Sequence, residues 1–242
     1  NAIASYQGNP TVHNHGALLF GVPFLRVLGT RNRYSATSVD QLPHMLAALE
    51  MFGHQLLLPV PDVDRTDYFL VLGANPLVSN GSLITAGGIE RRIKDMQRRG
   101  GKLVVVDPRR TETADIADRH LSIQPGADAW LLAGMLATIF DEKLDDLGRM
   151  APWTDGIGAV RAALAPFTAD AVAPAVGIDA ETIRALAREF AAAPSAVAYG
   201  RVGCSVQEFG GLACWLVNVL NAVTGNLDRA GGAMFTTPAV DF

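Results

Sequence analysis

Residue types suited to binding a nucleotide follow four apolar stretches of the sequence. These positions are Gly73 and Asn75, then Asp107, Arg109 and Thr111, then Gln124, Gly126 and Asp128, and finally Gly200 and Gly203. A glycine lets the backbone come close to a phosphate, and an acid directly after a strand accepts hydrogen bonds from a ribose or a purine. Parallel strands end at one edge of a sheet, where such folds bind ligands. The pattern therefore predicts a nucleotide pocket at that edge.

The same residues have an ordinary structural interpretation, which stays open. Gly-Asn-Pro and Asp-Pro are common turn sequences, and α/β proteins contain several of them. The GxGxxG fingerprint of dinucleotide-binding domains is missing, because neither 73–75 nor 200–203 satisfies it. An ordinary NAD-binding domain is therefore an alternative that the sequence disfavours.

The elements that must position these residues form an alternating α/β pattern. Continuous apolar runs typical of buried strands occupy 68–72, 103–106, 120–123 and 196–199. An amphipathic helix at 89–99 joins the first two, which is the spacing of a βαβ unit with parallel strands. Strands that are apolar throughout indicate a sheet covered on both faces. The expected fold class is α/β, a Rossmann-like parallel sheet with helices on both faces, preceded by a helical segment.

Helix signals divide the chain into two expected parts. Helices are predicted at 17–28, 42–51, 129–141, 180–190 and 209–224. The aspartates before three of them, Asp40, Asp128 and Asp179, are preferred N-caps. The polar stretches 3–16 and 29–38 predict loops. We expect a helical segment at 3–66, which contributes to a neighbouring domain or packs on the sheet, and an α/β nucleotide-binding domain at 67–242.

Composition argues against two kinds of partner. The formal net charge is −4, and the 20 basic and 24 acidic residues are interspersed, so the sequence has no basic stripe for nucleic acid. The longest apolar stretches, at 17–25 and 212–223, are shorter than the ~20 residues that span a membrane. The two cysteines, Cys204 and Cys214, fit no zinc or iron–sulfur pattern and are expected in the core.

Both ends of the sequence differ from those of a typical complete protein. The chain starts without Met, and its first residues, Asn1 and Ala2, resemble the scar of a removed tag. The last residues, 240–242, follow a Gly-Gly turn with no helix signal. We therefore expect this chain to be an internal segment of a longer protein.

Five motifs in order carry a resemblance to a known family. They are YQGNP at 6–10, LGANP at 72–76, VDPRRTETA at 106–114, IQPGAD at 123–128 and LNAVTGNLDRAGG at 220–232. Their series resembles that of the dimethyl-sulfoxide-reductase family of molybdopterin oxidoreductases, which includes formate dehydrogenases and nitrate reductases. The resemblance implies a molybdenum or tungsten atom held by the dithiolenes of two molybdopterin guanine dinucleotides, with two-electron redox or oxygen-atom transfer as the chemistry.

The resemblance also implies a role for the residues that follow the strands. The segment seen here would grip one of the two guanine dinucleotides. By position, Gly73 and Asn75 would approach the phosphates, Asp107 and Arg109 the nucleoside, and Gln124, Gly126 and Asp128 the guanine edge or the ribose. An acid suits guanine, because guanine presents adjacent N–H donors.

A protein ligand to the metal is implied after a Gly-x-x-Asn pattern, which is found here at 29–32. The ligand position falls some eight residues later, where no cysteine stands, so Asp40 is the first candidate ligand and Ser38 the second. His44, one turn further on, would be a proton carrier near the metal or simply a packed histidine. The structural alternative for Asp40 is an N-cap of the helix at 42–51.

Other parts of the family's architecture have no counterpart in this sequence. The N-terminal cysteine cluster for a [4Fe–4S] centre and the C-terminal domain that grips the second nucleotide are missing from it. We therefore expect the isolated chain to be inactive and to hold no cofactor, with the remaining domains and iron–sulfur or other electron-transfer subunits as partners. A metal-free electron-conduit subunit related to the family is the alternative function. The cytoplasm is preferred over the periplasm, and the substrate stays open.

Overall fold

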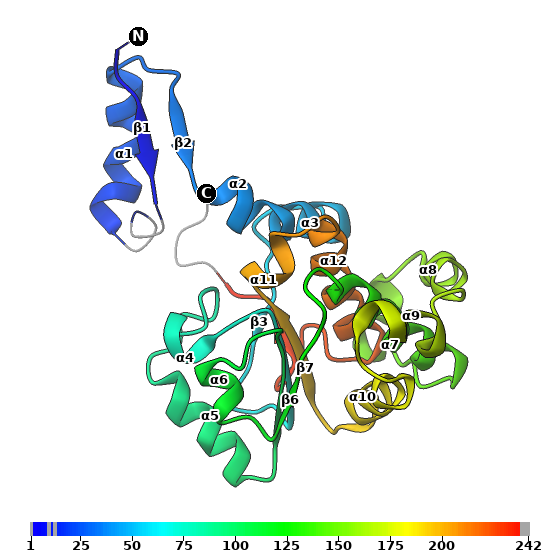
Figure 1. Cartoon of the computed structure of the whole chain (residues 1–242). Helices are drawn as coiled ribbons and strands as arrows, with labels where there is room; N and C mark the ends of the chain where they lie inside the picture. Colours follow the sequence, from blue (N-terminus) through cyan, green and yellow to red (C-terminus); the bar gives the residue numbers. More distant parts are fainter. Residues whose placement is uncertain (1, 9–10, 12–13, 238–242) are drawn as a thin grey trace.

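A four-stranded parallel sheet forms the centre of the protein in the computed structural model, which describes residues 2–8, 11 and 14–237 (Figure 1). Its strands are β4 (Tyr68–Leu72), β5 (Lys102–Val106), β6 (Arg119–Leu121) and β7 (Ala196–Gly200). They lie in the order β6-β5-β4-β7, and every neighbouring pair is parallel. The predicted α/β fold class is therefore confirmed.

Helices cover both faces of the sheet, as the continuous apolar strands predicted (Figure 1). One face carries α4 (Pro76–Ser79), α5 (Ile89–Arg98) and α6 (Glu112–Asp115). The other carries α7 (Asp128–Asp141), α8 (Ile157–Leu164), α9 (Ala169–Val176), α10 (Ala180–Ala192) and α12 (Gly210–Val223), with η2 (Gly148–Trp153) and α11 (Val202–Ser205) in the connections. Successive side chains of a strand point to opposite faces of the sheet. Phe69 therefore packs in the core under α5, and Leu70 packs in the core under α7, α9, α10 and α12.

The side chains of two asparagines form hydrogen bonds with the backbone groups on the outer edge of β7. The Asn221 side chain accepts a hydrogen bond from the Ala198 N–H at 2.9 Å and donates one to the Ala198 carbonyl at 2.9 Å. The Asn226 side chain accepts from the Ala196 N–H at 3.0 Å. A sheet edge presents unpaired backbone groups, and here the amides of the motif at 220–232 take the place of another strand.

The N-terminal part of the chain contains β1 (Ser5–Gln7), α1 (His15–Val27), β2 (Arg33–Ser35), α2 (Thr37–Asp40) and α3 (Leu42–Phe52). Of these elements, β1, α1 and β2 lie apart from the sheet domain, whereas α3 packs beside α12 (Figure 1). Strand β3 (Val60–Pro61) precedes β4 and pairs with β8 (Ala233–Met234) in a separate antiparallel sheet. The loops predicted at 3–16 and 29–38 are wrong in part, because β1 and β2 form a parallel pair there. Three-residue strands with mostly exposed side chains show too little alternation to be recognised.

Two of the three predicted aspartate caps are wrong. Asp40 is the last residue of α2, and the cap position of α3 is Gln41. Asp128 is the first residue of α7 rather than the residue before it. Both carboxylates bind side chains elsewhere in the fold, which removes them from capping. Asp179 does cap α10 by accepting a hydrogen bond from the Thr182 N–H at 2.8 Å, as predicted.

Within the described residues, no helix taken alone has both the length and the apolar character needed to cross a membrane. The helices α8 and α9 meet that criterion only as a pair with a bend of 67° between them. The division into a segment at 3–66 and a domain at 67–242 stays a prediction.

Candidate functional site

The carboxyl edge of the sheet contains a topological switch point. The chain runs from β4 to β5 and β6 on one side, and β7 then returns to the other side of β4. Leu72 lies beside Val106 and beside Gly200 in the strand register, so the three strands end together. Ligands of open α/β sheets bind in the crevice at such a point.

A cavity of about 420 Å³ opens at this edge. Seven of the residues that line it were predicted as site residues from the sequence: Asp40, Gly73, Asn75, Asp107, Arg109, Thr111 and Gly203. Its volume lies in the range of pockets that bind small molecules and cofactors. The fold therefore brings the segment near Asp40 to the ends of β4, β5 and β7.

Two glycines at the switch point touch each other. The Gly203 N–H donates to the Gly73 carbonyl at 2.9 Å. A Cβ atom on Gly203 would lie 2.6 Å from the Gly73 Cα, and one on Gly73 would lie 2.8 Å from the Cys204 backbone nitrogen. Gly73 also has a φ of +53°, which L side chains rarely adopt. Close packing of the two turns therefore explains why glycine occupies both positions, without a ligand.

Asn75 holds α4 and α6 together at the cavity wall. Its Oδ1 accepts a hydrogen bond from the Thr113 hydroxyl at 2.7 Å, and its Nδ2 donates to Glu112 Oε2 at 2.7 Å. Both polar atoms of the Asn75 side chain thus bond within the protein, which agrees with a structural role for this asparagine in the turn after β4.

The turn after β5 is organised by its own side chains. Asp107 Oδ1 accepts from the Arg109 N–H at 2.8 Å, and Thr111 caps α6 by accepting from the Ala114 N–H at 3.1 Å. The exposed Arg109 guanidinium lies 3.2 Å from Glu112. These bonds fix the loop, and the side chains of Asp107 and Arg109 line the cavity.

Arg201 is a buried cation at the cavity that the sequence reasoning missed. Its Nη2 donates to Asp40 Oδ1 at 3.1 Å, and only 6% of its side chain is exposed. Its Nε and Nη1 atoms are buried without a hydrogen-bond partner among the described residues. The sequence pattern that could have identified Arg201 is its position between Gly200 and Gly203, directly after the apolar strand.

His44 is held by the chain at both ring nitrogens. Its Nε2 donates to the Gly200 carbonyl at 2.9 Å, so Nδ1 is the acceptor for the Ser205 hydroxyl at 3.1 Å and the Cys214 thiol at 3.2 Å. Burial lowers the pKa of His44 to about 4. The ring is therefore neutral near pH 7, and the choice between a proton carrier and a packed histidine stays open, while Ser38 is exposed on α2.

The buried Asp128 and the half-buried Gln207 form a polar pair beyond β6. Asp128 accepts hydrogen bonds from Gln207 Nε2 at 2.7 Å and from the Cys204 thiol at 3.4 Å, and burial raises the pKa of its carboxyl. Gln207 Nε2 also donates to the carbonyl of Gly203, which lines the cavity. The Oε1 atom of Gln207 is buried with no partner in the part of the chain that is described.

The turn before α7 lies against this pair. Gly126 has a φ of +86°, and a Cβ atom there would lie 3.8 Å from Gln207 Oε1. Gln124 is exposed and packs against Gly177, where an added Cβ would meet its side chain at 2.8 Å. Gly126 and Asp128 therefore lie beside Gln207, Gln124 lies beside Gly177, and none of the three predicted residues lines the cavity itself.

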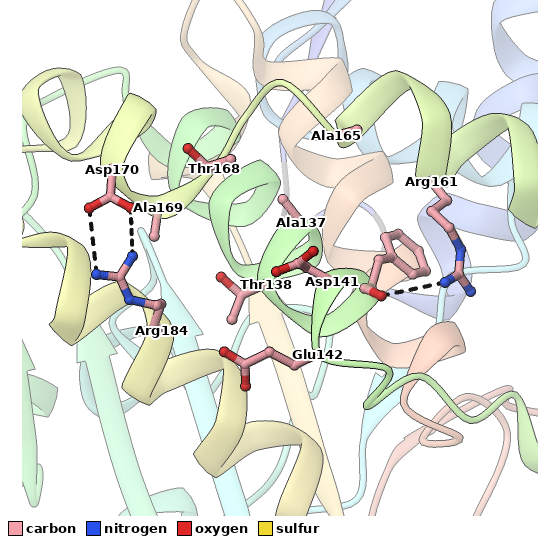
Figure 2. A pocket seen from close by; sticks show the side chains of 11 residues that line it. Ala137, Thr138, Asp141, Glu142, Arg161, Ala165, Thr168, Ala169, Asp170 and Arg184 are labelled. Carbon is pink, nitrogen blue, oxygen red and sulfur yellow. Dashed lines mark hydrogen bonds and ion pairs between the residues drawn. The ribbon is translucent and has the colours of Figure 1, made fainter.

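A second cavity of about 400 Å³ lies over the last turn of α7 (Figure 2). Since α7 begins at the carboxyl edge and is 14 residues long, this groove is ~20 Å from the switch point. Figure 2 shows Arg184 turned toward Asp170, 2.8 Å away, and Arg161 donating to the Phe140 carbonyl. Arg161 also pairs with Asp145, so both guanidinium groups are engaged within the protein.

Metal-binding capacity within the described ranges is limited. No group of three or more His, Cys, Asp or Glu side chains there is placed to hold a metal ion.

The fold and the cavity define a Rossmann-like α/β protein with a ligand-sized crevice at its switch point. The sequence model of the molybdopterin oxidoreductase family matches residues 13–237, and the chain belongs to that family. The resemblance inferred from the five motifs is thereby confirmed, and membership implies a molybdenum–molybdopterin cofactor. Positions 9 and 10 of the first motif lie outside the described residues.

The proteins that this chain resembles are named for several different activities. Formate dehydrogenase H of Escherichia coli is 29% identical over 204 residues, covering 84% of this chain and 28% of that protein. Dimethyl sulfoxide/trimethylamine N-oxide reductase of Cereibacter sphaeroides is 32% identical over 202 residues, covering 79% and 24%. The solved structure of acetylene hydratase from Pelobacter acetylenicus superposes with a TM-score of 0.72 at 27% identity, covering 87% and 28%. The chain thus spans about a quarter of the length of these relatives.

Proposed function

We propose that this chain is the part of a molybdenum or tungsten oxidoreductase that grips one guanine dinucleotide of a bis-molybdopterin guanine dinucleotide cofactor. The observation that carries the proposal is the cavity at the switch point, where loops after β4, β5 and β7 meet the segment containing Asp40. The cofactor, when bound, supplies two-electron redox or oxygen-atom-transfer chemistry.

Polar groups at the site suit such a ligand. Gln207 Oε1 is a buried acceptor with no partner within the described residues, and it lies beside Asp128 and Gly126. A guanine edge carries adjacent N–H donors, which pair with an amide oxygen or a carboxylate. An unsatisfied buried acceptor costs ~1–3 kcal/mol, so a donor from a ligand would stabilise this site.

Different residues around the cavity would contact different parts of the guanine dinucleotide. Gly73 and Asn75 would face the phosphates, Asp107 and Arg109 the nucleoside, and Gln124, Gly126 and Asp128, joined by Gln207, the guanine edge or ribose. In this assignment the guanine-reading residues lie next to the cavity and are connected to it through the Gly203 carbonyl.

Asp40 is the proposed protein ligand to the metal. Its side chain is 38% exposed at the cavity, and one of its oxygens pairs with Arg201. In a loaded enzyme that contains this chain, Asp40→Ala and Asp40→Asn should both abolish turnover while metal and GMP content stay unchanged. X-ray absorption at the metal edge should then lose one oxygen neighbour, and an unchanged spectrum would rule out Asp40 as the ligand.

A [4Fe–4S] cluster in such an enzyme would take its cysteines from outside this chain. Four Cys thiolates hold a cluster of this kind, whereas this chain has two cysteines, both buried. Further domains and electron-transfer subunits are the proposed partners.

Calorimetric titration of the 242-residue chain with GDP and ADP tests the nucleotide proposal. GDP should bind with one site, and ADP should bind at least ~10-fold more weakly, because a correctly paired base edge is worth ~1–3 kcal/mol. Gln207→Leu should remove the preference for GDP, whereas Glu142→Gln in the groove of Figure 2 should retain it. Equal affinities for the two nucleotides would contradict guanine recognition.

A further inference from the structure

We infer that Arg201 binds an oxyanion at the switch point of the sheet, in competition with Asp40. The inference rests on the proposed function to the extent that both place a ligand in the same cavity. It goes further by assigning the ligand chemistry to a residue that the family motifs quoted above do not include.

Arg201 has buried hydrogen-bond donors without a partner among the described residues. A guanidinium group has five N–H donors and stays charged in proteins. Arg201 is 5% exposed, and of its three nitrogens only Nη2 has a side-chain partner within the described residues. Burying charged donors without acceptors is costly, so the arrangement calls for an acceptor that carries negative charge.

Backbone carbonyls of the turns around Arg201 already accept hydrogen bonds. The Gly200 carbonyl accepts from His44 at 2.9 Å, and the Gly73 carbonyl accepts from Gly203 at 2.9 Å. The Leu72 carbonyl accepts from the Arg201 N–H at 3.2 Å. Each of these carbonyls already accepts a donor and carries no net charge, whereas an anionic ligand would supply new acceptors that carry negative charge.

Asp40 contacts the Arg201 guanidinium through one oxygen only. The two side chains share one contact of 3.1 Å, and the Asp40 side chain is 38% exposed while that of Arg201 is 6% exposed. Because Nε and Nη1 are buried, an anion gains access by displacing the Asp40 carboxylate, which is the more exposed of the two side chains. The anion then replaces one negative charge by another, so the buried cation stays neutralised.

The ligand chemistry is a small group with two or more anionic oxygens. An arginine matches the geometry of carboxylates and phosphates. Two sources have this chemistry: the phosphate of a nucleotide, or a free oxyanion such as formate or nitrate. Both fit a cavity of about 420 Å³.

The test is an NMR titration of the wild-type chain, observed at the arginine Nε–H groups. Inorganic phosphate, GMP, formate and nitrate are the probes, and the Arg201 signal is assigned by its loss in Arg201→Lys. At least one probe should shift this signal with saturation. The Arg184 signal should stay in place, because Arg184 is already paired with Asp170 and Glu181.

Variants then separate binding from folding. Arg201→Met should weaken the anion ~10-fold or more, since charge-assisted hydrogen bonds are lost. Asp40→Asn should strengthen it several-fold, because the competing carboxylate is gone. Arg184→Met should leave the affinity unchanged. If Arg201→Met fails to fold, the wild-type titration and Asp40→Asn decide the question.

The outcomes distinguish this inference from the proposed function. Binding of GMP with weak or no binding of formate and nitrate identifies a nucleotide phosphate, and the reverse identifies a free oxyanion. Normal GDP binding with no shift at Arg201 overturns the inference and leaves the nucleotide site intact. Anion binding at Arg201 without guanine preference overturns the nucleotide site alone. Weaker anion binding by Asp40→Asn would refute the competition.

Discussion

Replacing Gly203 by alanine should separate the two turns that form the switch point. The new methyl group would lie 2.6 Å from the Gly73 Cα and 2.8 Å from the Gly73 carbonyl oxygen, well inside van der Waals contact. The backbone would have to move by about 1 Å, at a cost typical of overpacking, ~1–3 kcal/mol. The Gly203–Gly73 hydrogen bond would be lost as well, adding about 1 kcal/mol.

The expected total is a loss of ~2–4 kcal/mol in the free energy of unfolding, a decrease in Tm of roughly 4–16 °C for a protein of this size. Thermal unfolding by circular dichroism measures it directly. Gly158→Ala is the matched control, because that glycine lies in α8 with nothing near its added Cβ. It should stabilise the chain by about 0.5–1 kcal/mol. A Gly203→Ala variant as stable as the wild type would refute the close-packing argument.

Three further substitutions have defined expectations. Asp40→Asn should destabilise the chain by ~1–3 kcal/mol in urea unfolding, because Arg201 loses its counter-charge, whereas a capping aspartate would tolerate asparagine. Because the pKa of His44 is lowered to about 4, the unfolded state binds more protons below pH 6.5, and stability should fall from pH 6.5 to 4 by at most about 3 kcal/mol. His44→Gln should flatten that part of the pH profile, and an unchanged slope would contradict it. Asn221→Ala leaves both peptide groups of Ala198 unpaired and should cost ~2–4 kcal/mol in urea unfolding, and a loss below 0.5 kcal/mol would contradict its edge role.

The sheet could be predicted from local pattern because its strands are apolar without interruption. The strand at 68–72 has the bounds expected from the sequence, and the helix at 89–99 ends within a residue of its predicted position. Their periodicity is a property of a few neighbouring residues, which sequence reading detects. The exposed strands β1 and β2 lack that signal and were missed.

The site could be predicted only in part because its key contacts are long-range. Asp40 was expected to be a metal ligand or to cap the next helix, and the side chain that it contacts, Arg201, lies 161 residues later in the chain. Gln207 likewise reaches Asp128 across 79 residues. No local pattern marks such pairs, and they become visible only when the strands bring distant turns to one edge.

Chemical-shift mapping of the ¹⁵N-labelled chain with GDP shows whether the nucleotide binds at the switch point of the sheet. We expect saturable shifts at the amides of Gly73, Asp107, Arg201 and Gly203, which lie together at the carboxyl edge of the sheet. The amide of Arg184, in the groove of Figure 2, should not move. Shifts that gather at that groove, or no saturable shifts at the carboxyl edge, would contradict the assignment of the nucleotide site to the switch point.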